Sequence, residues 1–485
     1  MFREILYSLV FLLSVAAFTK VRSPRVRQPM LLIGSYVLYL SWGAWFAGVL
    51  LASTVMNFLL GQWLRRKPTR LALTTGILLN LALLGSFKYL PEVAVNVSLL
   101  SLQRFSHLAL PLGISFWTFQ AMSYLFDLYR GEELDPSFFE FALYMAFFPV
   151  AISGPICRMP DMLPQFRSEK LTAWNDIGRG FARIATGVLM MQLARLLGQG
   201  ILSGDGINRG FDRVTLWSGA DVWCLAFGYA LQLFFDFAGY SHIAVGAAKA
   251  LGFFLPENFA RPFQSTTPSM FWTRWHMSLS FWIRDYVFLP LAMMRREIWW
   301  RNLTLVLSMV LFGLWHKATV LFLLWGCYHG VLLVSHRQLQ QLQGKSGWHP
   351  LTVLWTPLSW LATTTLISLG WILFRANSLP QAVQMLSAAF SPASYFSRFL
   401  SGSLYLLVFA LAAGYTTVLL VNEVLDRHSV KPGAAPAPSR SPIIAAIARN
   451  RWYWIPPLYG LALVVVLIVT HTRDAGAAQF MYRRF

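Results

Sequence analysis

Long apolar runs recur along the whole chain and are separated by short segments that carry most of the charged residues. A helix needs about 20 residues to cross the hydrocarbon core of a bilayer, and most of the runs approach that length. The pattern predicts an all-α polytopic membrane protein with about twelve crossings. We expect these near residues 4–19, 30–41, 44–64, 71–87, 109–128, 184–203, 216–238, 303–316, 318–336, 354–374, 403–421 and 454–471.

Three apolar stretches depart from a simple span. Runs 30–41 and 303–316 are short for a bilayer, so we expect tilted, kinked or partly re-entrant helices there. The stretch 138–156 ends in Gly154-Pro155, a pair that disfavours a continuing helix. We interpret this stretch as a helix that dips into the membrane and returns.

Composition supports the membrane interpretation. The 485 residues are 56% hydrophobic and only 12% charged, whereas about a quarter of the residues in a soluble domain are charged. So few charges cannot cover a soluble globule of this size, which excludes a soluble enzyme, a disordered chain and a fibrous repeat.

The net charge of +20 would indicate a nucleic-acid partner in a soluble protein. Here most of the 40 Lys and Arg lie in loops that the alternating spans place on one side, as the positive-inside rule requires. We therefore predict a protein of the lipid bilayer, with both termini outside and no nucleic acid as a partner.

Two non-spanning segments differ from the other loops. The predicted inside segment 239–302 mixes Trp, Arg and His with apolar residues and shows no clean span. Polar or irregular backbone at membrane depth is tolerated only where it is buried in protein or lines a cavity, so we predict a structured cytoplasmic funnel there. Segment 429–442 is rich in Pro, Ala and Ser and is predicted to be a flexible loop.

Ionisable residues in the apolar runs are candidates for chemistry, because inserting one costs about 2.5–3.5 kcal/mol. Asp236 ends one predicted span and His316 ends another. A neutral imidazole at His316 can take a proton from an attacking hydroxyl or thiol; the alternative is an interfacial histidine bonded to a carbonyl. We interpret His242 and His329 as helix-packing residues with satisfied nitrogens.

A second candidate cluster surrounds His276. Arg274 and Trp275 precede it and Arg284 follows, a set that suits a phosphate-rich ligand such as a nucleotide or coenzyme. The alternative is an interfacial helix with ordinary snorkelling arginines. The three cysteines form no CxxC pair and no HExxH, Walker or GxSxG motif occurs, so we predict no metal site.

Several sequence blocks occur together and in order, and they resemble a known family. They resemble the bacterial alginate O-acetyltransferase membrane-subunit branch of the membrane-bound O-acyltransferase (MBOAT) superfamily, over nearly the whole chain. The blocks are LPLGISFWTFQAMSYLFDLYRG (110–131), FFPVAISGPICRMPDMLPQF (147–166), GYALQLFFDFAGYS (228–241), LGFFLPENFARPF (251–263), FWTRWHMSLSFWIRDYVFLPL (271–291), FGLWHKA (312–318) and WILFRANSL (371–379).

The resemblance implies a ring of tilted helices around a thinned membrane centre, with a tunnel from a cytoplasmic donor site to the outer face. The family's catalytic histidine matches His316 and its second signature histidine matches His276. The donor is typically acetyl-CoA, and the acetyl group usually passes through an extracytoplasmic SGNH-type partner to a glycan hydroxyl. We therefore expect an O-acetyltransferase of the bacterial cytoplasmic (inner) membrane that acts on an exopolysaccharide or on peptidoglycan.

The resemblance implies acetyl-CoA as the acyl donor, without a metal, and the basic and aromatic funnel suits the phosphates and adenine of CoA. The expected donor-site residues are Arg274, Trp275, Arg284, Asp236, Trp315 and Lys317. We expect one integral-membrane domain over residues 1–485. Its predicted parts are N-terminal helices (1–128), a core with the funnel (129–374), C-terminal helices (375–471) and an extracytoplasmic tail (472–485).

The chain ends in FMYRRF, an F-x-Y-x-x-F pattern formed by Phe480, Tyr482 and Phe485. It resembles the C-terminal acyl-carrying motif of D-alanylation and peptidoglycan-acetylation systems. The hypothesis is that Tyr482 takes the acetyl group as a phenol ester and passes it to a serine of the partner. The alternative is a frayed tail with an aromatic interfacial anchor.

Two positions depart from the family pattern and two other functions compete. Lys317 stands where the family usually has Gly, and His242 stands where it has Asp; a charge beside His316 would favour the neutral imidazole. The first competing function is transfer of D-alanine from a carrier protein to a wall polymer. The second is a lipid or sugar transporter without chemistry, which predicts inverted repeats that the sequence does not show.

Overall fold

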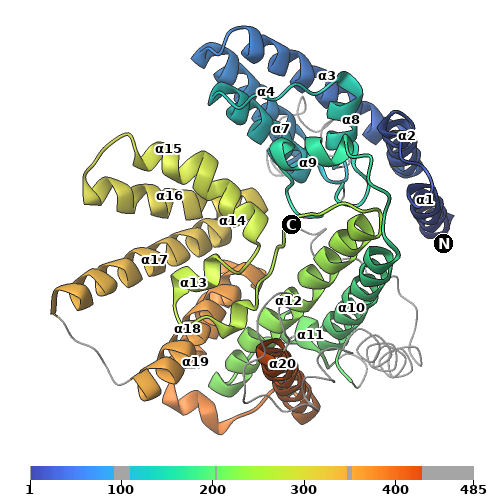
Figure 1. Cartoon of the computed structure of the whole chain (residues 1–485). Coiled ribbons are helices and arrows are strands. Elements are labelled where there is room, and N and C mark those ends of the chain that lie inside the picture. The colour runs from blue at the N-terminus through green and yellow to red at the C-terminus, as the bar shows by residue number, and fades with distance from the viewer. Residues whose placement is uncertain are drawn as a thin grey trace. The chain divides into compact units, whose positions relative to one another are not determined.

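The computed structural model describes residues 2–91, 110–151, 153–201, 205–212, 214–346 and 352–428. Throughout these ranges the regular structure is helical and no β-strand occurs, which confirms the all-α fold class (Figure 1). The helices are α1 (Phe2–Phe18), α2 (Pro24–Trp42), α3 (Ala44–Arg66), α4 (Arg70–Lys88), α7 (Ile114–Tyr129), α8 (Phe138–Ala146), α9 (Met159–Phe166), α10 (Trp174–Gln199), α11 (Ile207–Asp212), α12 (Gly219–Ala250), α13 (Pro268–Trp272), α14 (Met277–Ile283), α15 (Leu289–Ala292), α16 (Ile298–His316), α17 (Val320–Ser346), α18 (Thr352–Arg375), α19 (Leu379–Phe390) and α20 (Gly402–His428).

In the described part of the chain, eight helices are long and apolar enough to cross a membrane. They are α3, α4, α10, α12, α16, α17, α18 and α20. The predicted span 454–471 and the predicted loop 429–442 lie outside the described residues. A multi-pass membrane architecture is therefore confirmed, while the count of about twelve crossings stays a prediction.

The expectation of a short helix over 303–316 is wrong. Helix α16 begins at Ile298 and contains 19 residues, enough to count among the candidate spans. The first turn carries Trp299, Trp300 and Arg301, whose polar ends can reach an interface while their apolar parts continue the helix. A search for purely apolar runs omits such a turn.

The predicted end of the span 216–238 is also wrong, because α12 continues to Ala250; the funnel over 239–302 stays a prediction. Two glycines allow the α10 backbone to approach closely along this extension. A Cβ on Gly239 would lie 2.7 Å from the carbonyl oxygen of Gly187, and one on Gly246 would lie 2.7 Å from that of Gly180. Close backbone approach at small residues is a common way for membrane helices to pack.

Contacts between Cα atoms divide the chain into two compact units, which are described separately. The first unit comprises Met1–Ile184, Ser241–Asn258 and Met277–Leu289. The second unit comprises Ala185–Tyr240, Phe259–His276 and Pro290–Phe485. The division falls within α10 and α12 and directly after His276, so both units are discontinuous in sequence.

Helices α2, α3, α4, α7 and α8 pack together in the first unit. The buried amides of Asn57 and Asn80 donate to each other at 2.7 and 3.1 Å and link α3 to α4. Helix α8 starts with a capping box of Ser137 and Glu140, and Arg167 pairs with Glu140 at 2.7 Å. It ends at Ala146, so the stretch 138–156 is partly non-helical; its re-entry into the membrane stays a prediction.

The second unit contains the hairpin of α16 and α17, followed by α18 and α19. Helices α16 and α17 lie side by side along most of their length (Figure 1). Glycines make this close packing possible: a Cβ on Gly326 would lie 2.5 Å from the carbonyl oxygen of Met309, and one on Gly330 would lie 2.8 Å from the Cα of Val306. The hairpin therefore holds the end of α16 in a fixed place against α17.

Candidate functional site

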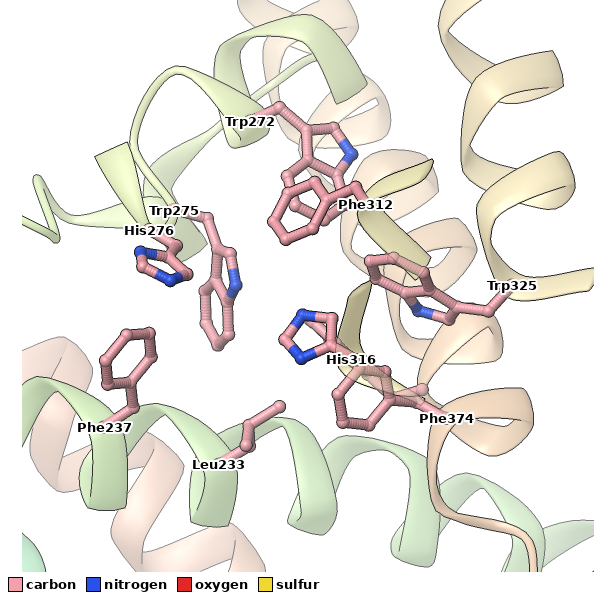
Figure 2. Close-up of a pocket in the computed structure, with 10 residues that line it drawn as sticks. Leu233, Phe237, Trp272, Trp275, His276, Phe312, His316, Trp325 and Phe374 are labelled. Atoms are coloured by element: carbon pink, nitrogen blue, oxygen red, sulfur yellow. The ribbon is translucent and has the colours of Figure 1, made fainter. Parts of the chain in front are cut away.

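Two of the predicted site histidines, His276 and His316, line one pocket of the second unit (Figure 2). The lining comes from α12, α13 and the turn after it, α16, α17 and α18. Aromatic side chains dominate it; the full set is Leu233, Phe237, Trp272, Trp275, His276, Phe312, His316, Trp325, Trp371 and Phe374. Small-molecule sites are typically concave and mostly apolar with a few polar groups, as here.

His316 is the last residue of α16 and is 5% exposed. Its ring stacks on Phe312 at 5.4 Å between centroids and meets the edge of Phe374 at 5.1 Å. Trp315 lies 4.6 Å away and Trp325 lies 6.0 Å away, nearly perpendicular to the imidazole. The imidazole is thus held in one orientation by rings from three helices.

Glycine at position 313 explains how α17 approaches the turn that bears His316. A Cβ there would lie 2.2 Å from the carbonyl oxygen of Phe322 and 3.2 Å from the indole of Trp325. Any larger residue would push α17 and this indole away from α16. Gly313 therefore sets the distance between His316 and the Trp325 wall of the pocket.

His276 occupies the turn between α13 and α14 and has a φ of 44°, in the left-handed region. That conformation is uncommon for a residue other than glycine. The backbone N–H of Ala260 donates to the carbonyl of Arg274 at 3.0 Å, which ties the turn to the chain before α13. The His276 ring meets the edge of Phe237 on α12 at 4.5 Å.

Burial determines the protonation of His276, which lies between the candidate spans and is 1% exposed. Removal from water disfavours the charged imidazolium and lowers the pKa of His276 to about 3. His276 is therefore a neutral hydrogen-bonding group at physiological pH. His276 and His316 lie on either side of Trp275 in the view of Figure 2.

The other predicted donor residues of the second unit occupy different environments. Trp275 lines the pocket, and Trp315 contacts both pocket histidines at ring distances of 4.6 and 6.5 Å. Asp236 is buried on α12 beside lining residues but is not itself a lining residue. Lys317 is exposed at the C-terminal cap of α16, and Arg274 is half-buried.

Arg284 belongs to the first unit, where it forms part of an arginine cluster that the sequence did not reveal in full. Its Nε contacts an Asp285 carboxylate oxygen at 2.7 Å, and Arg158 pairs with the same carboxylate at 2.6 Å. Arg130 donates to the backbone carbonyl of Asp285 at 2.7 Å and lies over the ring of Tyr286. Burial tends to raise the pKa of Asp285, but the hydrogen bonds from Arg284 and Arg158 outweigh it and lower that pKa.

Three guanidinium groups gather at Asp285, and Asp127 is a second carboxyl group beside Arg130 and Arg158. Guanidinium groups gathered in this way can bind an anion. Arg284 and Asp285 lie in a single π-helical turn, Arg284–Phe288, and such turns are frequent at functional sites. Arg130 and Arg158 both lie in the blocks that carried the family resemblance. Only the fold of the first unit shows that they meet at Asp285.

His329 packs between helices as predicted, but the prediction that its ring nitrogens are hydrogen-bonded is wrong. His329 is fully buried on α17 and packs against Trp272, Trp325 and Trp371 at ring distances of 5.2, 4.9 and 6.2 Å. Neither ring nitrogen has a hydrogen-bond partner among the described residues. The same holds for Nδ1 of His242.

Comparisons with known proteins show the family of this chain. The model of the membrane-bound O-acyltransferase family matches residues 103–374, more than half of the chain. The chain belongs to this family. It is therefore a multi-pass membrane protein and an O-acyltransferase, which uses an acyl donor. Both pocket histidines fall within the matched region.

Relatives with assigned names come from several cell-envelope systems. A probable alginate O-acetylase of Azotobacter vinelandii is 34% identical over 76% of this chain and 73% of its own length. The peptidoglycan O-acetyltransferase of Helicobacter pylori is 31% identical over 75% of this chain and 74% of its own. The teichoic acid D-alanyltransferase of Bacillus subtilis is 31% identical over 55% of this chain and 69% of its own.

The remaining predicted site residues lie at the C-terminus. Tyr482, Phe480 and Phe485 are outside the described residues, so their roles stay predictions. Among the residues that are described, no group of three His, Cys, Asp or Glu side chains is arranged to hold a metal ion.

Proposed function

We propose that this O-acyltransferase moves the acetyl group of cytoplasmic acetyl-CoA across the bacterial cytoplasmic membrane, for O-acetylation of an extracytoplasmic glycan. Support comes from relatives named for O-acetylation of alginate and of peptidoglycan, which match three quarters of this chain. The D-alanyltransferase relative matches only 55%. The acceptor is accordingly an exopolysaccharide or peptidoglycan.

The observation that carries this proposal is the placement of His276 and His316 in one pocket whose other walls are apolar and aromatic. Water competes poorly in such a place, so an acyl thioester is protected from hydrolysis and electrostatic effects are strengthened. Because His276 is held neutral, its part is to hold groups by hydrogen bonds. His316 is the general base.

The transfer step conserves atoms and charge. The acceptor O–H gives its proton to His316 while its oxygen bonds to the acyl carbon. The C–S bond then breaks, and the departing thiolate takes the proton from His316. The histidine is regenerated and only the acetyl group has changed partner, which is why CoA itself need not cross the membrane.

The donor is recognised through its phosphates and its flat ring system. Arg274 and Arg284 supply guanidinium groups for phosphate, and Trp275 and Trp315 supply aromatic faces beside the reacting centre. Arg130 and Arg158 lie beside Arg284 at Asp285. Asp236 and Lys317 complete the proposed donor set.

The C-terminal tail receives the acetyl group from the donor and carries it onward. Tyr482 is the first acceptor within the F-x-Y-x-x-F motif, with Phe480 and Phe485 as apolar anchors. A phenol with a pKa near 10 is a better leaving group than an alkyl alcohol, so its ester can pass the acetyl group onward. The next acceptor is the serine of an extracytoplasmic SGNH-type partner, which delivers the group to the glycan.

The decisive test replaces His316 with alanine in the purified enzyme, reconstituted in liposomes with labelled acetyl-CoA. Removal of the general base lowers the transfer rate at least about 10²-fold. The matched control is His336→Ala on α17, because His336 contacts Ser269 rather than the pocket. Retained transfer in His316→Ala would overturn the proposal.

Donor identity is tested in the same liposomes. We expect acetyl-CoA to support turnover, whereas a D-alanyl carrier protein does not. Turnover with the charged carrier protein alone would instead assign the chain to D-alanine transfer.

A further inference from the structure

The side-chain polar atoms of the pocket belong to only two kinds of ring. Its lining consists of four tryptophans, three phenylalanines, one leucine and two histidines. Polar side-chain contacts to a bound acyl group must therefore come from indole N–H groups or from imidazole nitrogens. Acyl transfer places a negative charge on the carbonyl oxygen, and enzymes of this kind stabilise it with preorganised N–H donors.

Three of the four indoles have N–H groups that are buried and have no hydrogen-bond partner among the described residues. They belong to Trp272, Trp325 and Trp371, which are 7%, 1% and 1% exposed. Outside the pocket, the indoles of Trp217 and Trp282 donate to the carbonyls of Gly210 at 2.9 Å and Phe119 at 3.0 Å, whereas the indole of Trp117 also has no partner among the described residues. A buried donor without a partner lowers stability, so an explanation is required.

Trp325 is the member of this group with a ring contact to His316, at 6.0 Å and 88°. The backbone geometry fixes its position. Gly326 is pressed against the carbonyl of Met309, and Gly313 lies directly under the indole, with 3.2 Å between its would-be Cβ and the ring. The ring of Trp371 lies 6.0 Å from that of Trp325 between centroids. The indole is therefore preorganised beside the proposed base.

We propose that the indole N–H of Trp325 is a catalytic hydrogen-bond donor to the acyl carbonyl oxygen. The inference rests on the proposed acyl transfer by His316. As the acceptor oxygen bonds to the carbonyl carbon and its proton passes to His316, the C=O π pair moves onto the oxygen, and the Trp325 N–H stabilises this oxyanion. The pair then returns to re-form C=O, and the thiolate leaves and takes the proton.

The test replaces the indole of Trp325 with a ring system of the same shape that lacks the N–H. Trp325 is replaced by 3-benzothienylalanine through stop-codon suppression, which exchanges the indole N–H for sulfur, and Trp325→Phe provides a second variant. We expect kcat to fall about 10²-fold, as for loss of one oxyanion-hole donor, with KM little changed. In the analogue we expect Tm to stay the same or rise, because the lost donor had no partner among the described residues. Trp325→Phe also removes buried ring atoms, so its Tm should fall.

The control is the same replacement at Trp217, whose N–H is bonded and which lies outside the pocket. There we expect a lower Tm and an unchanged kcat. A fall in kcat of less than tenfold in the Trp325 analogue, or an equal fall in the Trp217 analogue, overturns the inference. If His316→Ala is inactive in the same assay, the proposed function survives that outcome; an active His316→Ala removes both.

Discussion

At the scale of single residues, His276 and His316 are identical side chains that lie in different surroundings. His276 sits in a left-handed turn, is 1% exposed and is held neutral by burial. His316 ends a helix among stacked rings. The sequence indicated both residues, and it predicted His276 mainly as part of a phosphate-binding cluster. Only the fold shows that His276 packs against Phe237 and lines the same pocket as His316.

The depressed pKa of His276 predicts a pH dependence of stability. In the unfolded chain His276 takes a proton near its ordinary pKa of 6.5, whereas in the fold it does so only near 3. Between these values the unfolded state binds more protons, so stability is complete above pH 6.5 and is lost as the pH falls. From pH 7 to pH 5 we expect His276 alone to cost about 2 kcal/mol.

This prediction is checked by melting the detergent-solubilised protein at pH 7 and pH 5. The His276→Asn variant keeps a neutral polar group that tolerates a positive φ. We expect its Tm to fall less between the two pH values than that of the unaltered protein. An identical fall in both would show that His276 is protonated in the fold.

At the scale of elements, the α16–α17 hairpin positions the side chains of His316 and Trp325. The apolar pattern predicted both helices. It placed the start of α16 at residue 303 instead of Ile298, because the Trp-Trp-Arg turn is not purely apolar. It gave no indication that Gly313, Gly326 and Gly330 set the separation of the two helices. A glycine contributes nothing to an apolar pattern, yet its missing Cβ decides how closely two backbones approach.

We expect Gly326→Ala to destabilise the hairpin by about 1–3 kcal/mol through overpacking, because the new Cβ meets backbone atoms of Met309 and Val310. The acetyl-transfer rate should fall as well, since the position of Trp325 changes. The matched control is Gly414→Ala on α20, where nothing lies within 4 Å and alanine favours the helix. Thermal melting and transfer assays of both variants check this; equal Tm values would contradict it.

At the scale of the whole molecule, each compact unit carries one cluster suited to the reaction. The second unit holds the histidine pocket, and the first holds the arginine cluster at Asp285. The chain passes from the second unit to the first directly after His276. The family match from 103 to 374 covers parts of both units, so neither unit alone corresponds to it.

The acetyl route through the tail gives a prediction for the intact molecule. In cells, Tyr482→Phe should reduce O-acetylation of the glycan to background, because phenylalanine cannot form the ester. Glycan acetyl content and mass spectrometry of the C-terminal peptide from enzyme trapped with acetyl-CoA measure this. Tyr459 lies in the predicted span 454–471 and outside the F-x-Y-x-x-F motif, so Tyr459→Phe serves as the control and should retain acetylation. Full acetylation in Tyr482→Phe would remove the relay and leave direct transfer to the partner.

The sequence by itself determined the membrane class, the helical fold and the family, because apolar run length and ordered local blocks are properties of neighbouring residues. It also indicated the two histidines as candidates. Tertiary structure alone decided three further features. These are the placement of His276 and His316 in one pocket, the gathering of Arg130, Arg158 and Arg284 at Asp285, and the burial of the indole N–H groups of Trp272, Trp325 and Trp371 without hydrogen-bond partners among the described residues. Each depends on contacts between residues far apart in the chain, and hydrogen-bond satisfaction exists only once every neighbour has been placed.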